Sequence, residues 1–384
     1  MSLVAAGRVR VGARSVVLGV TLGAVLLSGC AARFDDRASG PFTTEPEWHD
    51  ADFGPEKKTP TTTKPPEGPC IDNTQGVVAT CLDITSGVVG LPDGITGLVA
   101  EHKLGRIFKI DTSDPTPLPH VLPQIAQLDV DTSGDGGLED LTISPSYTED
   151  GLMYAYISTA SDNRVVRIGE DGAAKPVLTG IPKGATGNHG AIEFITADTM
   201  LVLTGDAGNP AAAGDPNSLA GKVLRIKNPS PNTSAQPEVV ASGIETAGDL
   251  CIAPDSTIWF TDRTAVEDRL RWVGPDGTVN TGWTWTDHPG VAGCVAAADE
   301  VSVAMRNANG LAVAKADKDT HAITAIPTLT YQNKWGRMNA AAPGGNGTIW
   351  VGTINKEDGG QPTPNDDRVI LLSPPSGGGS GERG

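Results

Sequence analysis

A strand pattern repeats six times between residues 94 and 372, and this repetition constrains the fold more than any other feature of the chain. Each unit begins at a glycine or polar turn, continues as an apolar strand, turns at a Pro/Asp/Gly cluster and re-enters as a second apolar strand. The units start near Gly94, Leu138, Gly190, Asp249, Gly293 and Met338. Their spacing of about 45 to 60 residues is typical of four-stranded blades. The sequence therefore predicts an all-β fold, a six-bladed β-propeller.

Two stacked β-sandwiches are the alternative architecture, but six repeats are hard to divide between sandwiches. A sheet covered by helices is disfavoured, because the chain has no long apolar stripe with a period of 3.6 residues. Aromatic residues make up 4% of the sequence. We therefore expect Val, Leu, Ile and Ala to supply most of the packing between blades.

The first 29 residues have the layout of an export signal. Three arginines and no acidic residue precede an apolar run, Val16 to Leu27, which is too short for a stable membrane span. Cys30 follows Leu27-Ser28-Gly29, and this order resembles the bacterial lipobox. It predicts cleavage before Cys30, a lipid on its thiol, and anchoring at the extracytoplasmic face of the cell membrane. An ordinary signal peptide with an incidental cysteine is the alternative.

The composition divides the rest of the chain into three parts. Residues 30–67 are rich in Pro, Thr, Lys and Glu and are expected to form a disordered tether, because such a segment cannot bury a core. Residues 68–374 hold the repeats, and residues 375–384 form a Gly/Ser-rich tail. The formal charge of −17 becomes −20 once the three signal arginines are removed, which argues against binding nucleic acid. The sequence identifies no protein partner.

Four cysteines remain after Cys30, and an even number in an exported chain favours two disulfides. Cys70 and Cys81 would close a short loop at the start of the fold. Cys251 and Cys294 lie in strand runs of successive repeats, so a bond between them would join neighbouring blades. Metal binding is the competing interpretation, but no pair has CxxC spacing.

Four segments resemble the quinoprotein sugar dehydrogenases, also described as glucose/sorbosone dehydrogenases. The segments are Gly134 to Leu138, Gly187 to Ile226 (GNHGAIEF through GKVLRI), Asn280 to Trp283 and Trp335 to Met338. The resemblance implies a six-bladed propeller that oxidises a sugar with pyrroloquinoline quinone (PQQ) and calcium. The lipobox, tether and blades together are also similar to lipoproteins of actinobacteria.

The resemblance also implies roles for individual residues. His189 stands where the family's histidine takes the proton from the anomeric hydroxyl of the sugar, a task suited to imidazole near neutral pH. An acidic residue orients that histidine in the family, and Asn188 stands in its place here. Arg337 matches an arginine on the cofactor face, and Arg306, at the end of a strand, is a second candidate cation for the cofactor. Solvated surface arginines are the alternative.

Several positions depart from the family pattern. Glu245 stands where the family has an arginine that contacts the quinone. PQQ carries three carboxylates, so a glutamate at this position repels the cofactor that an arginine attracts. The segment that corresponds to the calcium loop contains Arg263 and Arg269, and guanidinium groups are not ligands for calcium. Asp135 replaces an expected glutamine. A propeller that has lost its chemistry and acts as a ligand-binding or scaffold lipoprotein is therefore the alternative function, and a propeller lactonase is a third.

One acidic segment has the residue spacing of a calcium-binding loop, and this observation is independent of the family resemblance. Asp129, Asp131, Ser133, Asp135 and Asp140 follow positions 1, 3, 5, 7 and 12 of an EF-hand loop, with Gly134 at position 6. No helices are expected on either side of it, and position 12 carries Asp instead of Glu. An acidic β-turn without metal is the favoured interpretation.

Overall fold

The computed structural model describes residues 68–113, 119, 121–231 and 236–373. The predicted signal, Cys30, the tether and the tail lie outside these residues. Within them, no helix is long and apolar enough to cross a membrane. All of the described residues belong to one compact unit.

Strands dominate the described part of the chain and form six antiparallel sheets of four strands each. The first three blades are β2 (Thr85–Gly90), β3 (Thr96–Glu101), β4 (Arg106–Asp111) and β5 (Gln124–Gln127); β6 (Leu138–Ile143), β7 (Met153–Ser158), β8 (Asn163–Ile168) and β9 (Ala174–Ile181); and β10 (Gly190–Thr196), β11 (Thr199–Thr204), β12 (Lys222–Lys227) and β13 (Glu238–Ser242). The last three are β14 (Thr246–Ile252), β15 (Ile258–Arg263), β16 (Asp268–Val273) and β17 (Val279–Trp285); β18 (Val291–Ala296), β19 (Glu300–Met305), β20 (Gly310–Lys315) and β21 (Thr328–Thr330); and β22 (Met338–Pro343), β23 (Ile349–Thr353), β24 (Val369–Leu372) and β1 (Val77–Ala79). The short helical turns are α1 (Tyr147–Asp150), α2 (Pro210–Gly214) and η1 (Gly345–Gly347).

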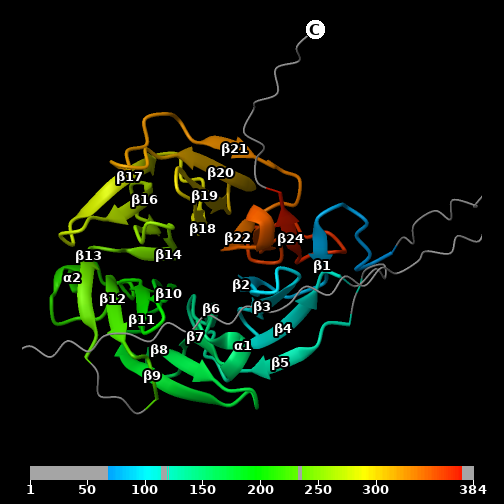
Figure 1. Cartoon of the computed structure of the whole chain (residues 1–384), viewed down its shortest axis with the longest axis horizontal. Coiled ribbons are helices and arrows are strands. Elements are labelled where there is room, and N and C mark those ends of the chain that lie inside the picture. The colour runs from blue at the N-terminus through cyan, green and yellow to red at the C-terminus, as the bar shows by residue number, and fades with distance from the viewer. Residues whose placement is uncertain (1–67, 114–118, 120, 232–235, 374–384) are drawn as a thin grey trace, which may run out of the picture. The chain divides into compact units, whose positions relative to one another are not determined.

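The six sheets close into a ring, as Figure 1 shows. The first strand of each blade lies innermost, and each of these strands contacts the first strands of both neighbouring blades. The last blade takes its outermost strand, β1, from the beginning of the described chain, where it pairs with β24. This pairing joins the two ends of the ring. The predicted six-bladed β-propeller is therefore confirmed, and the stacked sandwiches are excluded.

The start of the first repeat is corrected by the structure. Gly94 lies in the turn between β2 and β3, and the segment Glu101-His102-Lys103, which follows it, leads from β3 to β4. The innermost strand of this blade is β2, whose sequence TSGVVG carries two glycines and only two large apolar residues. A strand with so weak an apolar pattern is easily missed. The other five starts lie within or at the beginning of the innermost strands.

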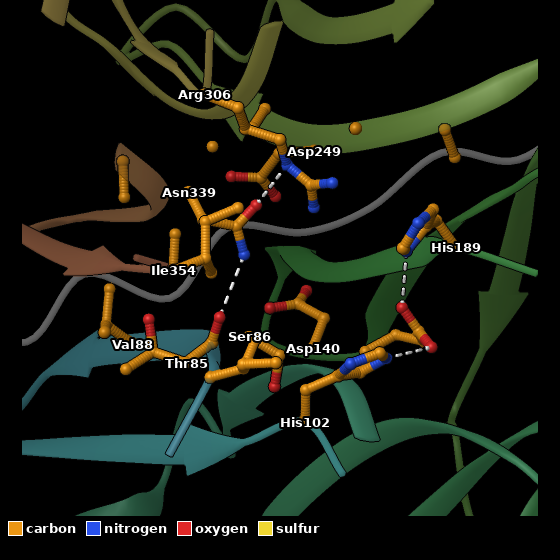
Figure 2. Close-up of a pocket in the computed structure, with 18 of the residues that line it drawn as sticks. Thr85, Ser86, Val88, His102, Asp140, His189, Asp249, Arg306, Asn339 and Ile354 are labelled. Atoms are coloured by element: carbon orange, nitrogen blue, oxygen red, sulfur yellow. Dashed lines mark hydrogen bonds and ion pairs between the residues drawn. The ribbon is translucent and has the colours of Figure 1, made fainter. Parts of the chain in front are cut away.

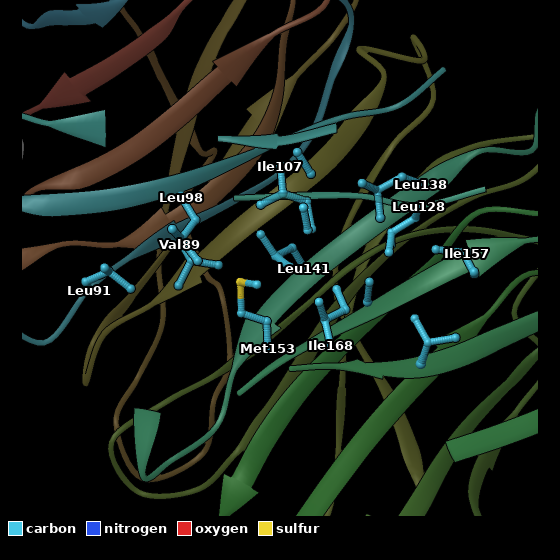
Figure 3. Packing of buried hydrophobic residues seen from close by; sticks show 14 residues of the cluster. Val89, Leu91, Leu98, Ile107, Leu128, Leu138, Leu141, Met153, Ile157 and Ile168 are labelled. Atoms are coloured by element: carbon cyan, nitrogen blue, oxygen red, sulfur yellow. The ribbon is translucent and has the colours of Figure 1, made fainter. Parts of the chain in front are cut away.

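Aliphatic side chains fill the spaces between blades, as expected from the low aromatic content. Figure 3 shows the cluster between the first two blades, where Val89, Leu98 and Ile107 pack with Leu141 and Met153. The few buried tryptophans are nevertheless among the largest core residues: Trp259 and Trp350 are each 2% exposed.

Both predicted disulfides are confirmed. Cys70 and Cys81 are joined at a Cα–Cα distance of 5.3 Å, and Cys251 is joined to Cys294 at 5.7 Å. The second bond connects β14 to β18 and so links two neighbouring blades covalently.

Candidate active site

The centre of the ring opens on one face into a cavity. All six innermost strands contribute to its lining, together with a few residues from the connections that precede or follow strands. Figure 2 shows this cavity, in which the polar side chains come from different blades. Because the strands begin at this face, a residue that stands just before an innermost strand reaches the mouth of the channel.

His189 stands immediately before β10 and lines the cavity. Its Nδ1 lies 2.7 Å from Oε2 of Glu139, at the beginning of β6. The other oxygen of Glu139 lies 3.0 Å from Nε2 of His102, in the connection between β3 and β4. One carboxylate therefore joins two imidazoles from different blades (Figure 2).

Burial and charge act against each other in this group. Burial by itself would raise the pKa of Glu139, but the two imidazoles and their hydrogen bonds outweigh it and hold the pKa well below its usual range. Burial opposes a charge on His102, but the carboxylate of Glu139 outweighs it and raises the pKa of His102. Glu139 is therefore an anion at neutral pH, and it stabilises positive charge on either neighbouring ring.

The two predicted cofactor arginines converge on one carboxylate at the same face. Arg337 Nη2 lies 2.9 Å from Oε2 of Glu357, and Arg306 Nη1 lies 3.9 Å from Oε1. Arg306 also donates from Nε to Oδ1 of Asn339 at 2.8 Å, as Figure 2 shows. Both Arg306 and Glu357 line the cavity.

A third guanidinium adds to this cluster. Arg263, at the end of β15, donates from Nη1 to the carbonyl of Val291 at 2.7 Å. Burial, together with the charge of Arg306, lowers the pKa of Arg263 to about 10. Burial also lowers the pKa of Arg306, and Arg337 contributes to this shift. Burial is the main cause of both shifts, and repulsion between the arginines adds to it, while nearby carboxylates, Glu357 among them, oppose it.

The comparisons with known proteins agree with this geometry. A family model described as "Glucose / Sorbosone dehydrogenase" matches residues 82–288. The chain belongs to the glucose/sorbosone dehydrogenase family. The match covers the first four blades and includes His102, Glu139 and His189, whereas Arg306 and Arg337 lie beyond it. No curated protein matches the sequence.

Solved structures extend the likeness to the whole ring. The PQQ-bound aldose sugar dehydrogenase of Streptomyces coelicolor is 26% identical, with a TM-score of 0.69, over 81% of this chain and 99% of that one. The putative glucose dehydrogenase of Thermus thermophilus is 24% identical, with a TM-score of 0.64, over 79% of this chain and 99% of that one. The apo aldose sugar dehydrogenase of Escherichia coli is 15% identical, with a TM-score of 0.62, over 78% and 99%. The last two likenesses concern the fold alone.

Asn188 does not contact the imidazole that it was expected to orient. Its buried amide donates to Oδ1 of Asp135 at 2.7 Å and to the carbonyl of Gly184 at 2.9 Å, so it stabilises the loop before β10. The hydrogen-bonded acidic partner of His189 is Glu139, 50 residues earlier in the chain, and Oδ2 of Asp135 lies 3.8 Å from the other ring nitrogen. Glu139 directly follows the Gly134 to Leu138 motif, but it is far from His189 in the sequence, and no local pattern links the two residues.

The segment that corresponds to the family's calcium loop is filled by guanidinium groups. Asp262 is fully buried and forms ion pairs with Arg269 and Arg271, the latter at 3.1 Å. The backbone N–H of Glu245 donates to the other oxygen of Asp262 at 3.2 Å, and the Glu245 carboxylate is among the charges that act on Arg271. Calcium requires several oxygen ligands, and here the central carboxylate is already occupied. The residues present do not fit calcium in this loop.

The acidic segment with EF-hand spacing is dispersed in the structure. Asp129 is exposed, Asp131 pairs with Lys183 at 3.2 Å and Asp135 accepts the backbone N–H of Gly187 at 2.7 Å. Asp140 instead turns into the channel, where it accepts the N–H of Ile192 at 2.8 Å. Among the described residues, no three His, Cys, Asp or Glu side chains are grouped so as to hold a metal ion.

Three carboxyl groups line the channel below the mouth: Asp140, Asp249 and Glu193. Burial raises the pKa of Asp140 to about 7, against the hydrogen bonds from two backbone N–H groups, and Glu139 adds to the rise. Burial raises the pKa of Glu193 to about 8, with a contribution from Asp140. Burial also raises the pKa of Asp249 well above its usual value.

We expect these carboxyl groups to make the fold less stable as the pH rises. Their pKa values in the unfolded chain are about 4, so their favourable contribution is complete below about pH 4 and is lost as the pH rises through about 7 to 8. Urea unfolding between about pH 5 and 9 should show a decline that is smaller in Asp140→Asn and Glu193→Gln. An identical pH dependence in the wild type and both variants would contradict this expectation.

Proposed function

We propose that this chain oxidises the anomeric hydroxyl of an aldose with PQQ, outside the cell membrane to which a lipid on Cys30 anchors it. The hydrogen bond between His189 and the buried anion Glu139, at a channel mouth that also holds a cluster of arginines, is the observation that carries the proposal. The 26% identity to a PQQ-bound aldose sugar dehydrogenase supports it.

His189 is suited to act as the general base. Its Nδ1 faces Glu139, and Nε2, which lies 3.8 Å from Oδ2 of Asp135, would take the proton of the sugar's C1 hydroxyl. Protonation places a positive charge on the ring, and the adjacent carboxylate stabilises that charge at a distance of 2.7 Å. The carbonyl at C1 forms as the hydroxyl loses its proton and C1 loses a hydride, so the product is a lactone. PQQ, when bound, supplies the acceptor for that hydride.

The guanidinium groups of Arg306 and Arg337 carry the charge that the carboxylates of PQQ require. Glu357 is the acidic partner that Arg306 and Arg337 share, so these two guanidinium groups have one paired carboxylate between them. Bidentate contact with carboxylates is the geometry that arginine favours. These residues would orient the cofactor beside His189 and exclude water from it. No step depends on calcium in the 262–269 segment.

A direct test is the titration of the purified chain with PQQ, with and without calcium, followed by dye reduction with a panel of aldoses. We expect stoichiometric binding and turnover of at least one aldose. Absence of both a quinone absorbance change and turnover would refute the enzymatic proposal.

Membrane fractionation of Cys30→Ser tests the anchor, and a variant that still sediments with membranes would refute it.

Substitutions in the arginine cluster should change PQQ affinity in opposite directions. Arg306→Gln removes a buried cation and should weaken binding by about tenfold or more, because hydrogen bonds to charged groups contribute about 1.5–3 kcal/mol. Glu357→Gln removes the carboxylate that competes with the ligand and should strengthen binding. Fluorescence or absorbance titration measures both constants. Equal affinities in the two variants would show that the cluster does not contact the cofactor.

A ligand-binding or scaffold lipoprotein without catalysis is the second candidate. It is favoured by the internal pairing of charges at the face, since Glu357 lies against Arg337 and Asp262 lies against Arg269 and Arg271. Tight, stoichiometric PQQ binding in the titration above would exclude it.

A further inference from the structure

The second imidazole at the channel mouth, His102, has no part in the chemistry proposed above, although it belongs to the same hydrogen-bonded group as the base. Its Nε2 lies 3.0 Å from Oε1 of Glu139, and Oε2 of that carboxylate lies 2.7 Å from Nδ1 of His189. Figure 2 shows both rings, each with a dashed line to the carboxylate between them. A change of charge on either ring therefore acts on the other ring through Glu139.

The position of the His102 ring is fixed by its surroundings. Its backbone N–H donates to the carbonyl of Ile84 at 2.8 Å, and its own carbonyl accepts the N–H of Leu138 at 2.9 Å. A Cβ atom on Gly137 would lie 2.5 Å from Cδ2 of the imidazole, so glycine at this position leaves room for the ring. His102 is 8% exposed. The segment that begins β6 therefore holds both the ring and the carboxylate that the ring meets.

The charges around His102 favour its protonated form. Burial lowers the pKa of His102, and so does the charge of Arg306, but the carboxylates of Glu139 and Glu357 outweigh them, and the pKa is raised. The side chain of Glu139 is 3% exposed, so its charge acts on the ring with little screening by water. His102 and Glu139 therefore form a buried ion pair at neutral pH.

His189 faces two carboxylates and one imidazole. Glu139 lies 2.7 Å from its Nδ1, Asp135 lies 3.8 Å from its Nε2, and the ring centre of His102 is 6.3 Å away. A carboxylate at such a distance favours the protonated ring, and a ring that is already protonated cannot act as a base. A positive charge on His102 has the opposite effect, because two imidazolium ions that share one carboxylate repel each other.

We infer that His102 is a positioning residue that, as an imidazolium, balances the charge of Glu139 and so keeps His189 unprotonated and ready to accept a proton at neutral pH. The inference rests on the proposed role of His189 as the base and adds the residue that sets the protonation state of that base. His102 acts through Glu139 and not by contact with the reacting atoms.

A pH titration of the imidazole nitrogens by NMR, on the full chain without PQQ, tests the inference directly. Single His→Gln variants assign the signals. In the wild type we expect His102 to lose its proton at a higher pH than His189. His102→Gln keeps a neutral N–H donor for Glu139 and removes the charge, so the midpoint of the His189 titration should rise by about 1 pH unit.

His288→Gln is the matched control. His288 also faces a carboxylate, since its Nδ1 lies 3.4 Å from Oδ1 of Asp268, but it lies between β17 and β18 and has no printed contact with Glu139 or His189. Its replacement should leave the midpoint of His189 unchanged.

Dye reduction with PQQ and an aldose gives a second readout. In His102→Gln the acidic limb of kcat/KM should move to higher pH, so that kcat/KM falls about tenfold below both midpoints and changes little on the alkaline side. A merely structural role for His102 would instead lower kcat/KM by the same factor at every pH, and that result would overturn the inference.

The NMR titration separates this inference from the proposed function. A raised His189 midpoint in His102→Gln supports the inference even in a protein that oxidises no sugar, which would refute only the proposed function. An unchanged His189 midpoint, or a His102 ring that is neutral at neutral pH in the wild type, overturns it. Glu139→Gln provides a measurement that does not depend on the folding of His102→Gln: both rings should lose their protons at lower pH than in the wild type, and unchanged midpoints would overturn the inference as well.

Discussion

Replacement of His189 by glutamine is expected to lower kcat for aldose oxidation by about 10²–10⁴-fold, the usual contribution of a general base. Glutamine can still hydrogen-bond to Glu139, but it has no nitrogen that accepts a proton near neutral pH. PQQ affinity should change little, because the arginine cluster lies on other blades. Steady-state dye reduction with saturating PQQ measures the loss.

Glu139→Gln is the companion variant. It keeps the imidazole and removes the carboxylate 2.7 Å from Nδ1. We expect a smaller loss of kcat than in His189→Gln, because the base remains but its positive charge is no longer stabilised. A His189→Gln enzyme with full activity would remove His189 from the mechanism. Equal losses in His102→Gln and Glu139→Gln would indicate that the second imidazole is needed to hold the carboxylate.

Replacement of Trp350 by alanine is expected to lower the free energy of unfolding by about 3–5 kcal/mol, as for other fully buried tryptophans. Trp350 belongs to β23 of the last blade, and its ring packs against the first blade. A Cβ atom on Gly97 would lie 2.6 Å from that ring, so glycine at this position allows the two blades to meet. The substitution therefore opens a cavity at the interface that closes the propeller.

Urea unfolding followed by circular dichroism measures this effect. Trp350→Phe retains most of the buried ring and should lose less stability than Trp350→Ala. Gly97→Ala should also destabilise the chain, because the added methyl group meets the indole. A Trp350→Ala protein as stable as the wild type would show that the contact between the first and last blades contributes little to the closed ring.

The repeat pattern was sufficient for the architecture but not for the closure of the ring. Apolar strands broken by Gly, Pro and Asp turns recur at blade spacing, and such local patterns can be recognised in the sequence alone. The innermost strand β2 was missed because its glycines replace large apolar residues where blades approach closely. The pairing of β1 with β24 joins residues almost 300 positions apart, and no local pattern encodes such a partner.

The sequence by itself determined the strand repeats, the placement of His189 before an innermost strand and the pairing of the cysteines, because each depends on local spacing or on a short motif. Only the tertiary structure decided which groups contact the imidazole. Glu139 contacts His189 from the second blade and joins it to His102 of the first, Asn188 turns away to Asp135, and Glu357 brings Arg306 and Arg337 together. Each of these contacts exists because the ring places the beginnings of distant strands around a single axis.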